Sequence, residues 1–312
     1  MPALLTPEAL ARVASLELRA RLIVEGFLTG LHRSPFHGFS VEFAEHRAYN
    51  AGDELRHVDW KVYGRNDRLF VKQYEEETNL RHYVVLDTSA SMRYSGAAGV
   101  SKLTYGATLA AALHALMARQ RDATGLMAFD ESVHTAVRPG ATRAHLQTLF
   151  AALERIAEAP AAAPAPGTAT AVAGALHDIA ARIPRRALVV VVSDLFDTGF
   201  GAGLGTDETV RALQHLRHRG HEVVVFHVLD AATERRFELP DTPVRVRDLE
   251  TGEQRTVLPG VIRAEVSAAA EAFVAELQRR CRESGVDYVP LDTAQPYADA
   301  LRAYLDKRRR LF

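Results

Sequence analysis

The stretch from Ala187 to Ser193 has the sequence Ala-Leu-Val-Val-Val-Val-Ser and is followed by an aspartate. A short, uninterrupted run of β-branched residues is typical of a strand that is buried on both faces. A similar run occupies His221–Leu229, and a third, His82–Asp87, also ends in an acid. Such strands occur in mostly parallel sheets that helices cover on both sides, and this pattern indicates the α/β fold class.

Segments with helical periodicity separate these apolar runs along the chain. They cover residues 103–120, 144–157, 171–183, 207–219, 267–284 and 297–310, and a further short strand is expected at 286–291. Two strands at 123–130 and 133–137 are joined by a tight link, which predicts a hairpin with an antiparallel edge strand. A polar β-hairpin insertion near 235–258 is expected to turn at Thr251-Gly252.

The first 78 residues follow a different pattern. Residues 7–31 have helical periodicity, whereas Gly38 to Asn79 is irregular and contains the single tryptophan, Trp60, and a strand-like stretch at 68–74. An acidic run at 75–77 ends this part. We therefore predict an N-terminal helix with a small β-rich segment over 1–78, and an α/β domain over 79–312.

Composition excludes several classes of function. The 38 basic and 39 acidic residues nearly balance, so nothing indicates the basic face that a nucleic-acid-binding protein needs. No stretch approaches the roughly 20 apolar residues that span a bilayer. A single cysteine, Cys281, has the spacing of a core residue and excludes a disulfide framework, which favours a reducing compartment. We expect a cytoplasmic protein.

The candidate site follows the first apolar strand, in the sequence Asp87-Thr88-Ser89-Ala90-Ser91. In open α/β sheets, ligands bind at the carboxyl ends of the strands, where the strand order reverses. If the strands 82–87 and 187–193 flank that reversal, Asp87 and Asp194 share one crevice. Carboxylate and hydroxyl oxygens are hard ligands that suit Mg²⁺ or Mn²⁺, and also Ca²⁺.

Other interpretations of the same residues stay open at this stage. Asp87 and Ser89 are also favoured helix N-caps. An apolar strand that ends in aspartate is found in phosphatases with an aspartate nucleophile, although the second acid that they need is replaced here by Ser89. The histidines at 215, 218 and 221 suggest a zinc site, and the glycines at 199, 201, 203 and 205 suggest a nucleotide-binding loop. The spacing of the residues disfavours both interpretations.

The Asp87-x-Ser89-x-Ser91 pattern resembles the metal-ion-dependent adhesion site of von Willebrand factor A domains. That resemblance implies a threonine from a second loop and an aspartate from a third, and Asp194 matches the latter. For the threonine, the distance to Ala175-Leu176 favours Thr170, with Thr168 as the fallback, and Ala169 stands where the family has glycine. The implied metal ligands are Asp87, Ser89, Ser91, Thr170 and Asp194.

The segment before the domain boundary narrows the resemblance. Its motifs resemble the opening signature of the domain-of-unknown-function-58 family, and Ser193–Asp197 is similar to that family too. The motifs are Phe43–Arg47, Tyr49–Asp53, Arg56–Lys61, Arg68–Val71 and Tyr74–Glu77. Members of that family carry a von Willebrand A-like domain and are often encoded beside AAA+ ATPases of the MoxR type, so the resemblance implies a partner or adaptor of such an ATPase.

Together these observations predict a protein that binds partners and does not catalyse a reaction. A divalent metal would be held by the chain, and an acidic residue of the partner, plausibly the MoxR-type ATPase, would complete its shell. Two alternatives remain: a scaffold whose metal site is vestigial, and a metal-dependent phosphohydrolase.

Overall fold

The computed structural model describes residues 6–32, 46–48, 64, 70–72, 81–160, 172–184, 186–196 and 206–309. The chain divides into two compact units, one made of residues 1–28 and 80–312 and the other of residues 29–79. In the second unit, β1 (His46–Ala48) pairs antiparallel with β2 (Phe70–Lys72), which lies inside the strand expected at 68–74. The site described below belongs to the first unit.

The first unit is built on a six-stranded sheet within the described ranges. Its order is β10-β7-β6-β3-β4-β5, and every pairing is parallel except β4 with β5. The strands are β3 (Arg81–Asp87), β4 (Thr124–Phe129), β5 (Val133–Gly140), β6 (Ala187–Ser193), β7 (Glu222–Leu229) and β10 (Asp287–Asp292). The predicted hairpin with an antiparallel edge strand is confirmed, because β5 lies at the edge beside β4.

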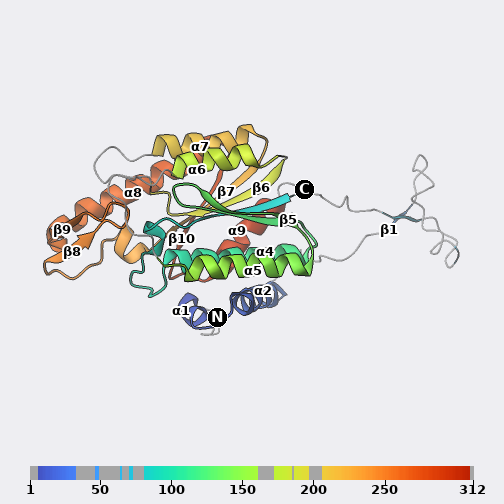
Figure 1. Ribbon diagram of the computed structural model, residues 1–312, viewed down its shortest axis with the longest axis horizontal. Coiled ribbons are helices and arrows are strands. Elements are labelled where there is room, and N and C mark those ends of the chain that lie inside the picture. The colour runs from blue at the N-terminus through green and yellow to red at the C-terminus, as the bar shows by residue number, and fades with distance from the viewer. Residues whose placement is uncertain are drawn as a thin grey trace. The chain divides into compact units, whose positions relative to one another are not determined.

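Helices cover both faces of this sheet (Figure 1). One face carries α4 (Lys102–Arg119), α5 (Arg143–Glu158) and α9 (Tyr297–Arg309), and the other carries α6 (Val172–Arg182), α7 (Thr206–His218) and α8 (Pro259–Glu283). The valine side chains of β6 and β7 alternate between the two faces and are fully buried, as a strand covered on both sides requires. Cys281 is a residue of α8 and is buried in the core, as predicted. The fold is therefore the mostly parallel, von Willebrand A-like α/β class expected from the sequence.

The N-terminal helices differ from the prediction. The stretch 7–31 forms two helices, α1 (Pro7–Ala11) and α2 (Leu16–His32), instead of one. The Arg19 guanidinium donates to the carbonyls of Ala11 and Val13 and so satisfies groups exposed at the break. The backbone N–H of Leu16 donates to Glu154 of α5 at 3.1 Å, and residues 1–28 belong to the same compact unit as the α/β sheet.

The C-terminal half also contains the predicted insertion. Strands β8 (Val244–Arg247) and β9 (Gln254–Val257) pair antiparallel, and Gly252 in their turn has a φ of 75° that glycine tolerates without strain. The helix expected from residue 267 begins at Pro259 instead. Most of its first two turns is exposed, so the apolar periodicity that marks a packed helix is missing there.

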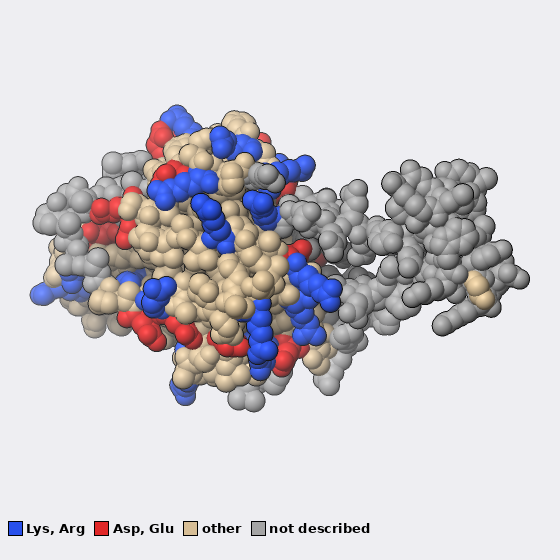
Figure 2. Space-filling model, turned by 45° about the vertical axis from the view of Figure 1, so that its right-hand side comes forward, with Lys and Arg blue, Asp and Glu red and all other residues tan. Residues whose placement is uncertain are grey.

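No helix within the described part of the chain has the length and apolar character needed to cross a membrane. On the face shown in Figure 2, basic and acidic side chains are interspersed, and neither sign covers the face alone.

Gly125 in β4 offers a test of how closely β4 and β5 approach. A Cβ at this position would lie 2.7 Å from the backbone oxygen of Val137 and 2.9 Å from the nitrogen of Pro139. Since backbone atoms cannot move aside cheaply, Gly125→Ala is expected to lower the free energy of unfolding by about 2 kcal/mol in a urea titration. Gly106→Ala is the control, because the nearest neighbours of its Cβ would be side-chain methyls, those of Leu86, Val192 and Met92, and not backbone atoms. Equal losses in the two variants would contradict this account.

Candidate metal site at the carboxyl ends of β3 and β6

The point where the strand order reverses lies between β3 and β6. The chain passes from β3 to β4 and β5 on one side, then returns to β6 on the other side of β3. Strands β3 and β6 are parallel neighbours, with Leu86 opposite Val192, so their carboxyl ends meet at one edge of the sheet. The assumption that placed Asp87 and Asp194 in one crevice is thereby confirmed.

Asp87 and the two serines of the first loop lie together. The Asp87 carboxylate is fully buried, and it accepts one hydrogen bond from the Ser89 N–H at 2.9 Å and another from the Ser193 hydroxyl at 2.5 Å. The hydroxyls of Ser89 and Ser91 are 3.1 Å apart. Three of the five predicted ligands therefore form one connected group of oxygens.

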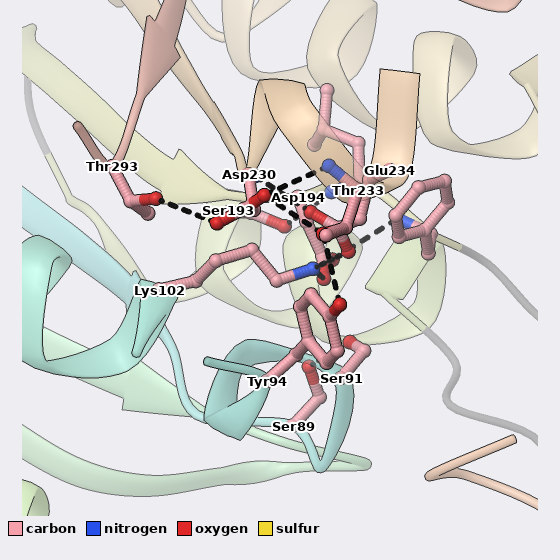
Figure 3. Close-up of polar contacts among 12 residues, drawn as sticks. Ser89, Ser91, Tyr94, Lys102, Ser193, Asp194, Asp230, Thr233, Glu234 and Thr293 are labelled. Carbon is pink, nitrogen blue, oxygen red and sulfur yellow. Dashed lines mark hydrogen bonds and ion pairs between the residues drawn. The ribbon is translucent and has the colours of Figure 1, made fainter. Parts of the chain in front are cut away.

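Asp194 is also buried, but its carboxylate is bound to a lysine. The Lys102 ammonium donates to Asp194 Oδ2 at 2.7 Å and to Glu234 Oε1 at 2.5 Å (Figure 3). Two aromatic rings lie beside it, with the ring centres of Phe196 and Tyr94 at 5.1 and 5.9 Å from Nζ. The Lys102 side chain is only 1% exposed, so this is a buried ion triad.

The sequence around α4 explains how a lysine reaches this position. Ser101 caps the helix by accepting from the Thr104 N–H at 3.0 Å, and Lys102 is the first helical residue. A cation at a helix N-terminus is electrostatically unfavourable unless acids offset it. Here the acids are Asp194 and Glu234, which approach from two other segments.

Glu234 is held by a single π-helical turn after β7, at 231–235. Asp230 begins that turn and accepts from the N–H and the hydroxyl of Thr233, while the second oxygen of Glu234 accepts from the Asp230 N–H at 2.7 Å. A Cβ on Gly96 would lie 2.4 Å from the Asp230 side chain, so the loop that carries the serines can pass close to Asp230 only with glycine there.

This crevice holds more buried acidic groups than basic ones, and the pKa values of several of these groups are shifted. Burial, and after it the neighbouring Asp194 carboxylate, raises the pKa of Asp87 to about 7. Burial also raises the pKa of Glu234. For Lys102, burial lowers the pKa, but the carboxylates of Asp194 and Glu234 outweigh it, and the pKa is raised overall. Burial lowers the pKa of His227, which contacts the Asp194 carbonyl oxygen, to about 4, so this imidazole is neutral at pH 7.

Several predictions lie outside the described residues. These are the second-loop threonines, Thr170 and Thr168, and the glycines at 199, 201, 203 and 205. The capping interpretation of Asp87 and Ser89 is wrong. The 3₁₀ turn at Ser91–Arg93 has Ala90 at its N-cap with no side-chain hydrogen bond, and α4 is capped by Ser101. His215, one of the three histidines considered for zinc, pairs with His177, and their Nδ1 atoms are 3.0 Å apart. Among the described residues there is no cluster of three His, Cys, Asp or Glu side chains suited to a metal.

Sequence reasoning missed four residues of the site: Ser193, Lys102, Glu234 and Glu250. Glu250, in the turn between β8 and β9, accepts from the Ser91 N–H at 2.6 Å. Only Lys102 carried a usable signal, since a lysine directly after a helix-capping serine runs against the helix dipole. The two glutamates come from segments far along the chain, and nothing in their local sequence marks them.

The donors that are present suit a hard divalent cation. The crevice holds three carboxylates, of which Asp194 and Glu234 share the Lys102 ammonium, while Asp87 forms no ion pair with any residue that the structure describes. Mg²⁺ takes carboxylate and hydroxyl oxygens and retains several waters, so Asp87 with the hydroxyls of Ser89 and Ser91 forms a suitable partial shell. Because the Lys102 ammonium already binds Asp194, the Asp194 carboxylate would contribute to metal binding only indirectly.

Residues 45–276 match the family model described as "Protein of unknown function DUF58". The chain belongs to the DUF58 family. Uncharacterized proteins from Mycobacterium tuberculosis and Mycobacterium bovis are 29% identical to this DUF58 chain over 306 residues, covering 97% of it and 91% of each relative.

Two solved structures are similar to the DUF58 chain at 18% identity. An aerotolerance-related membrane protein from Bacteroides fragilis aligns with 73% of this chain and 99% of its own, with a TM-score of 0.44. The conserved hypothetical protein BatB from Bacteroides thetaiotaomicron aligns with 74% of this chain and 99% of its own, with a TM-score of 0.41.

Proposed function

We propose that this DUF58 protein is a non-enzymatic, divalent-metal-dependent binding module that engages an acidic residue of a partner protein. The observation that carries the proposal is the uncompensated charge of Asp87. A buried carboxylate needs a cation or several hydrogen bonds to offset its desolvation. Asp87 accepts hydrogen bonds only from Ser89 and Ser193 and forms no ion pair among the described residues. A bound cation would supply the missing charge.

Asp87, Ser89 and Ser91 would hold the metal directly, and Asp194 would act from further out. Thr170 remains the proposed ligand from the second loop. Bound Mg²⁺ or Mn²⁺ supplies a positive charge with an open position that attracts a carboxylate. Ser193 orients Asp87 through its hydroxyl, and Lys102 keeps Asp194 and Glu234 in place, so the chain itself contributes a prearranged set of oxygens.

The proposed partner is a MoxR-type AAA+ ATPase, and the proposed process is protein maturation or complex assembly in the cytoplasm. This step rests on the resemblance to DUF58 proteins that are encoded beside such ATPases.

Capture of the MoxR-type ATPase from the same organism tests the metal-bridged model. The immobilised DUF58 protein is expected to retain the ATPase in Mg²⁺, and EDTA or Ser89→Ala should reduce retention about tenfold or more, since each removes part of the metal shell. Ser95→Ala is the matched control, because Ser95 lies in the same loop but is exposed. Equal capture under all conditions would overturn the model.

A second candidate function is a metal-free scaffold, and Lys102 is the observation that favours it. Its ammonium already neutralises Asp194, the acid that the adhesion-site pattern assigns to the metal. Electron paramagnetic resonance of added Mn²⁺ separates the two functions. Stoichiometric binding that Ser89→Ala abolishes supports the metal-dependent module, whereas no binding by the wild-type protein supports the scaffold.

A further inference from the structure

The β8–β9 hairpin brings an acidic side chain to the candidate metal loop. Glu250 lies 159 positions from Ser91 in the sequence, and its carboxylate accepts from the Ser91 N–H at 2.6 Å. Ser91 is the same residue whose hydroxyl is a proposed metal ligand and lies 3.1 Å from that of Ser89. The hairpin therefore places a carboxylate at the rim of the site, from the side of the β8–β9 insertion.

The turn of this hairpin is organised so that Glu250 is presented in one orientation. The Asp248 carboxylate accepts from the N–H groups of Glu250 and Thr251, at 2.8 and 3.1 Å. The backbone closes the turn through two further bonds, Asp248 to Glu253 and Gly252 to Asp248, each 2.9 Å. A side chain on such a turn loses little conformational freedom when it binds.

The base of the insertion is also fixed to the α/β unit. The Arg263 guanidinium of α8 donates to the carbonyls of Phe237 and Leu239, at 3.1 and 2.8 Å, and to the Asp241 carboxylate. The strands of the hairpin, by contrast, are polar and at most half-buried. The position of Glu250 thus depends on hydrogen bonds at the two ends of the insertion and not on burial of an apolar face.

We propose that Glu250 is an internal acidic ligand of the metal site, supplied by the β8–β9 hairpin in addition to the ligands of the loop after β3. The inference rests on the proposed metal-dependent function and deepens it. Metal affinity at oxygen sites rises with the number of charged ligands, and Glu250 would add a second carboxylate to that of Asp87. The metal would then tie the hairpin to the loop after β3.

Hydrogen exchange with Mg²⁺ and with EDTA tests this assignment in the full-length protein. In the wild-type protein, Mg²⁺ should slow amide exchange in residues 87–93 and also about fivefold or more in the hairpin, 244–257, because the metal pins both segments. In Glu250→Gln, saturating Mg²⁺ should still protect 87–93 but leave the hairpin unchanged. Glutamine keeps an oxygen that accepts from the Ser91 N–H, so exchange of the hairpin in EDTA should match the wild type.

Mn²⁺ affinity measured by electron paramagnetic resonance provides the second readout. Glu250→Gln should weaken it about tenfold. Glu253→Gln is the matched control, because Glu253 lies on the same turn, is exposed and pairs with Arg255. The hydrogen exchange and the Mn²⁺ affinity of Glu253→Gln should equal those of the wild type.

The two proposals fail in different ways. Protection of 87–93 by Mg²⁺ without any change in the wild-type hairpin, or a hairpin response in Glu250→Gln that equals the wild type, would overturn the role of Glu250 and leave the metal site standing. No protection of 87–93 and no Mn²⁺ binding in the wild type would overturn both.

Discussion

Replacing Lys102 by methionine is expected to lower the free energy of unfolding by about 3–5 kcal/mol, because it leaves Asp194 and Glu234 without their shared cation. Lys102 and Asp194 are both essentially buried, so solvent cannot take over the role of the ammonium. Methionine matches the length of the lysine stem and fills its space, so the loss reports the charge and not a cavity. Urea denaturation followed by circular dichroism at pH 7.5 in EDTA measures the effect.

Two further variants determine whether the loss is specific. Lys307→Met is the control, since Lys307 also pairs with two acids, Glu222 and Asp287, but on α9 its side chain is 14% exposed and that of Asp287 34%, against 1% for Lys102. It is expected to cost roughly 1 kcal/mol. Adding Asp194→Asn and Glu234→Gln to Lys102→Met should restore much of the lost stability, because no buried charge is then left unpaired. A loss in Lys102→Met no larger than in Lys307→Met would show that the triad contributes little.

The sheet and the position of the site could be predicted because local patterns determine them. The valine-rich runs of β6 and β7 have no favourable place except a sheet covered on both faces, and helical segments between them require parallel crossovers. In a parallel sheet the carboxyl ends of neighbouring strands meet at one edge, so Asp87 and Asp194 had to lie close once β3 and β6 were adjacent. The polar hairpin was visible through its alternation and its Thr251-Gly252 turn.

The partners of those acids could not be predicted, because they depend on tertiary contacts between distant segments. Glu234 comes from a π-helical turn, and Glu250 from a hairpin tip 159 positions beyond Ser91. Neither segment has a sequence periodicity that indicates which distant residues it will contact. The contact of the N-terminal helices with α5, through the Leu16 N–H and Glu154, could not be predicted for the same reason, since no local pattern reveals it.

Substituting Asp87 by asparagine is expected to stabilise the metal-free protein at neutral pH, in the opposite direction to Lys102→Met. The folded protein raises the pKa of Asp87 from 3.8 to about 7, mainly through burial and then through Asp194. Between these two values the folded state holds a proton that the unfolded state has lost, so stability falls as the pH rises from about 4 to about 7 and stays low above it. At 1.36 kcal/mol for each pH unit, this corresponds to roughly 4 kcal/mol at pH 7.5.

Asparagine removes the charge but keeps an oxygen for the Ser89 N–H. In EDTA, the difference in free energy of unfolding between Asp87→Asn and the wild type should therefore grow from near zero at pH 4 to a few kcal/mol at pH 7.5. Taking this difference cancels the contributions of groups common to both proteins, such as His114, whose pKa is lowered by burial. Saturating Mg²⁺ should stabilise the wild type and erase most of the difference, because the metal neutralises the Asp87 carboxylate, while leaving Asp87→Asn unchanged. A difference that does not vary with pH, or Mg²⁺ stabilisation that survives in Asp87→Asn, would mean that this carboxylate is already compensated within the protein and that the metal, if bound, lies elsewhere.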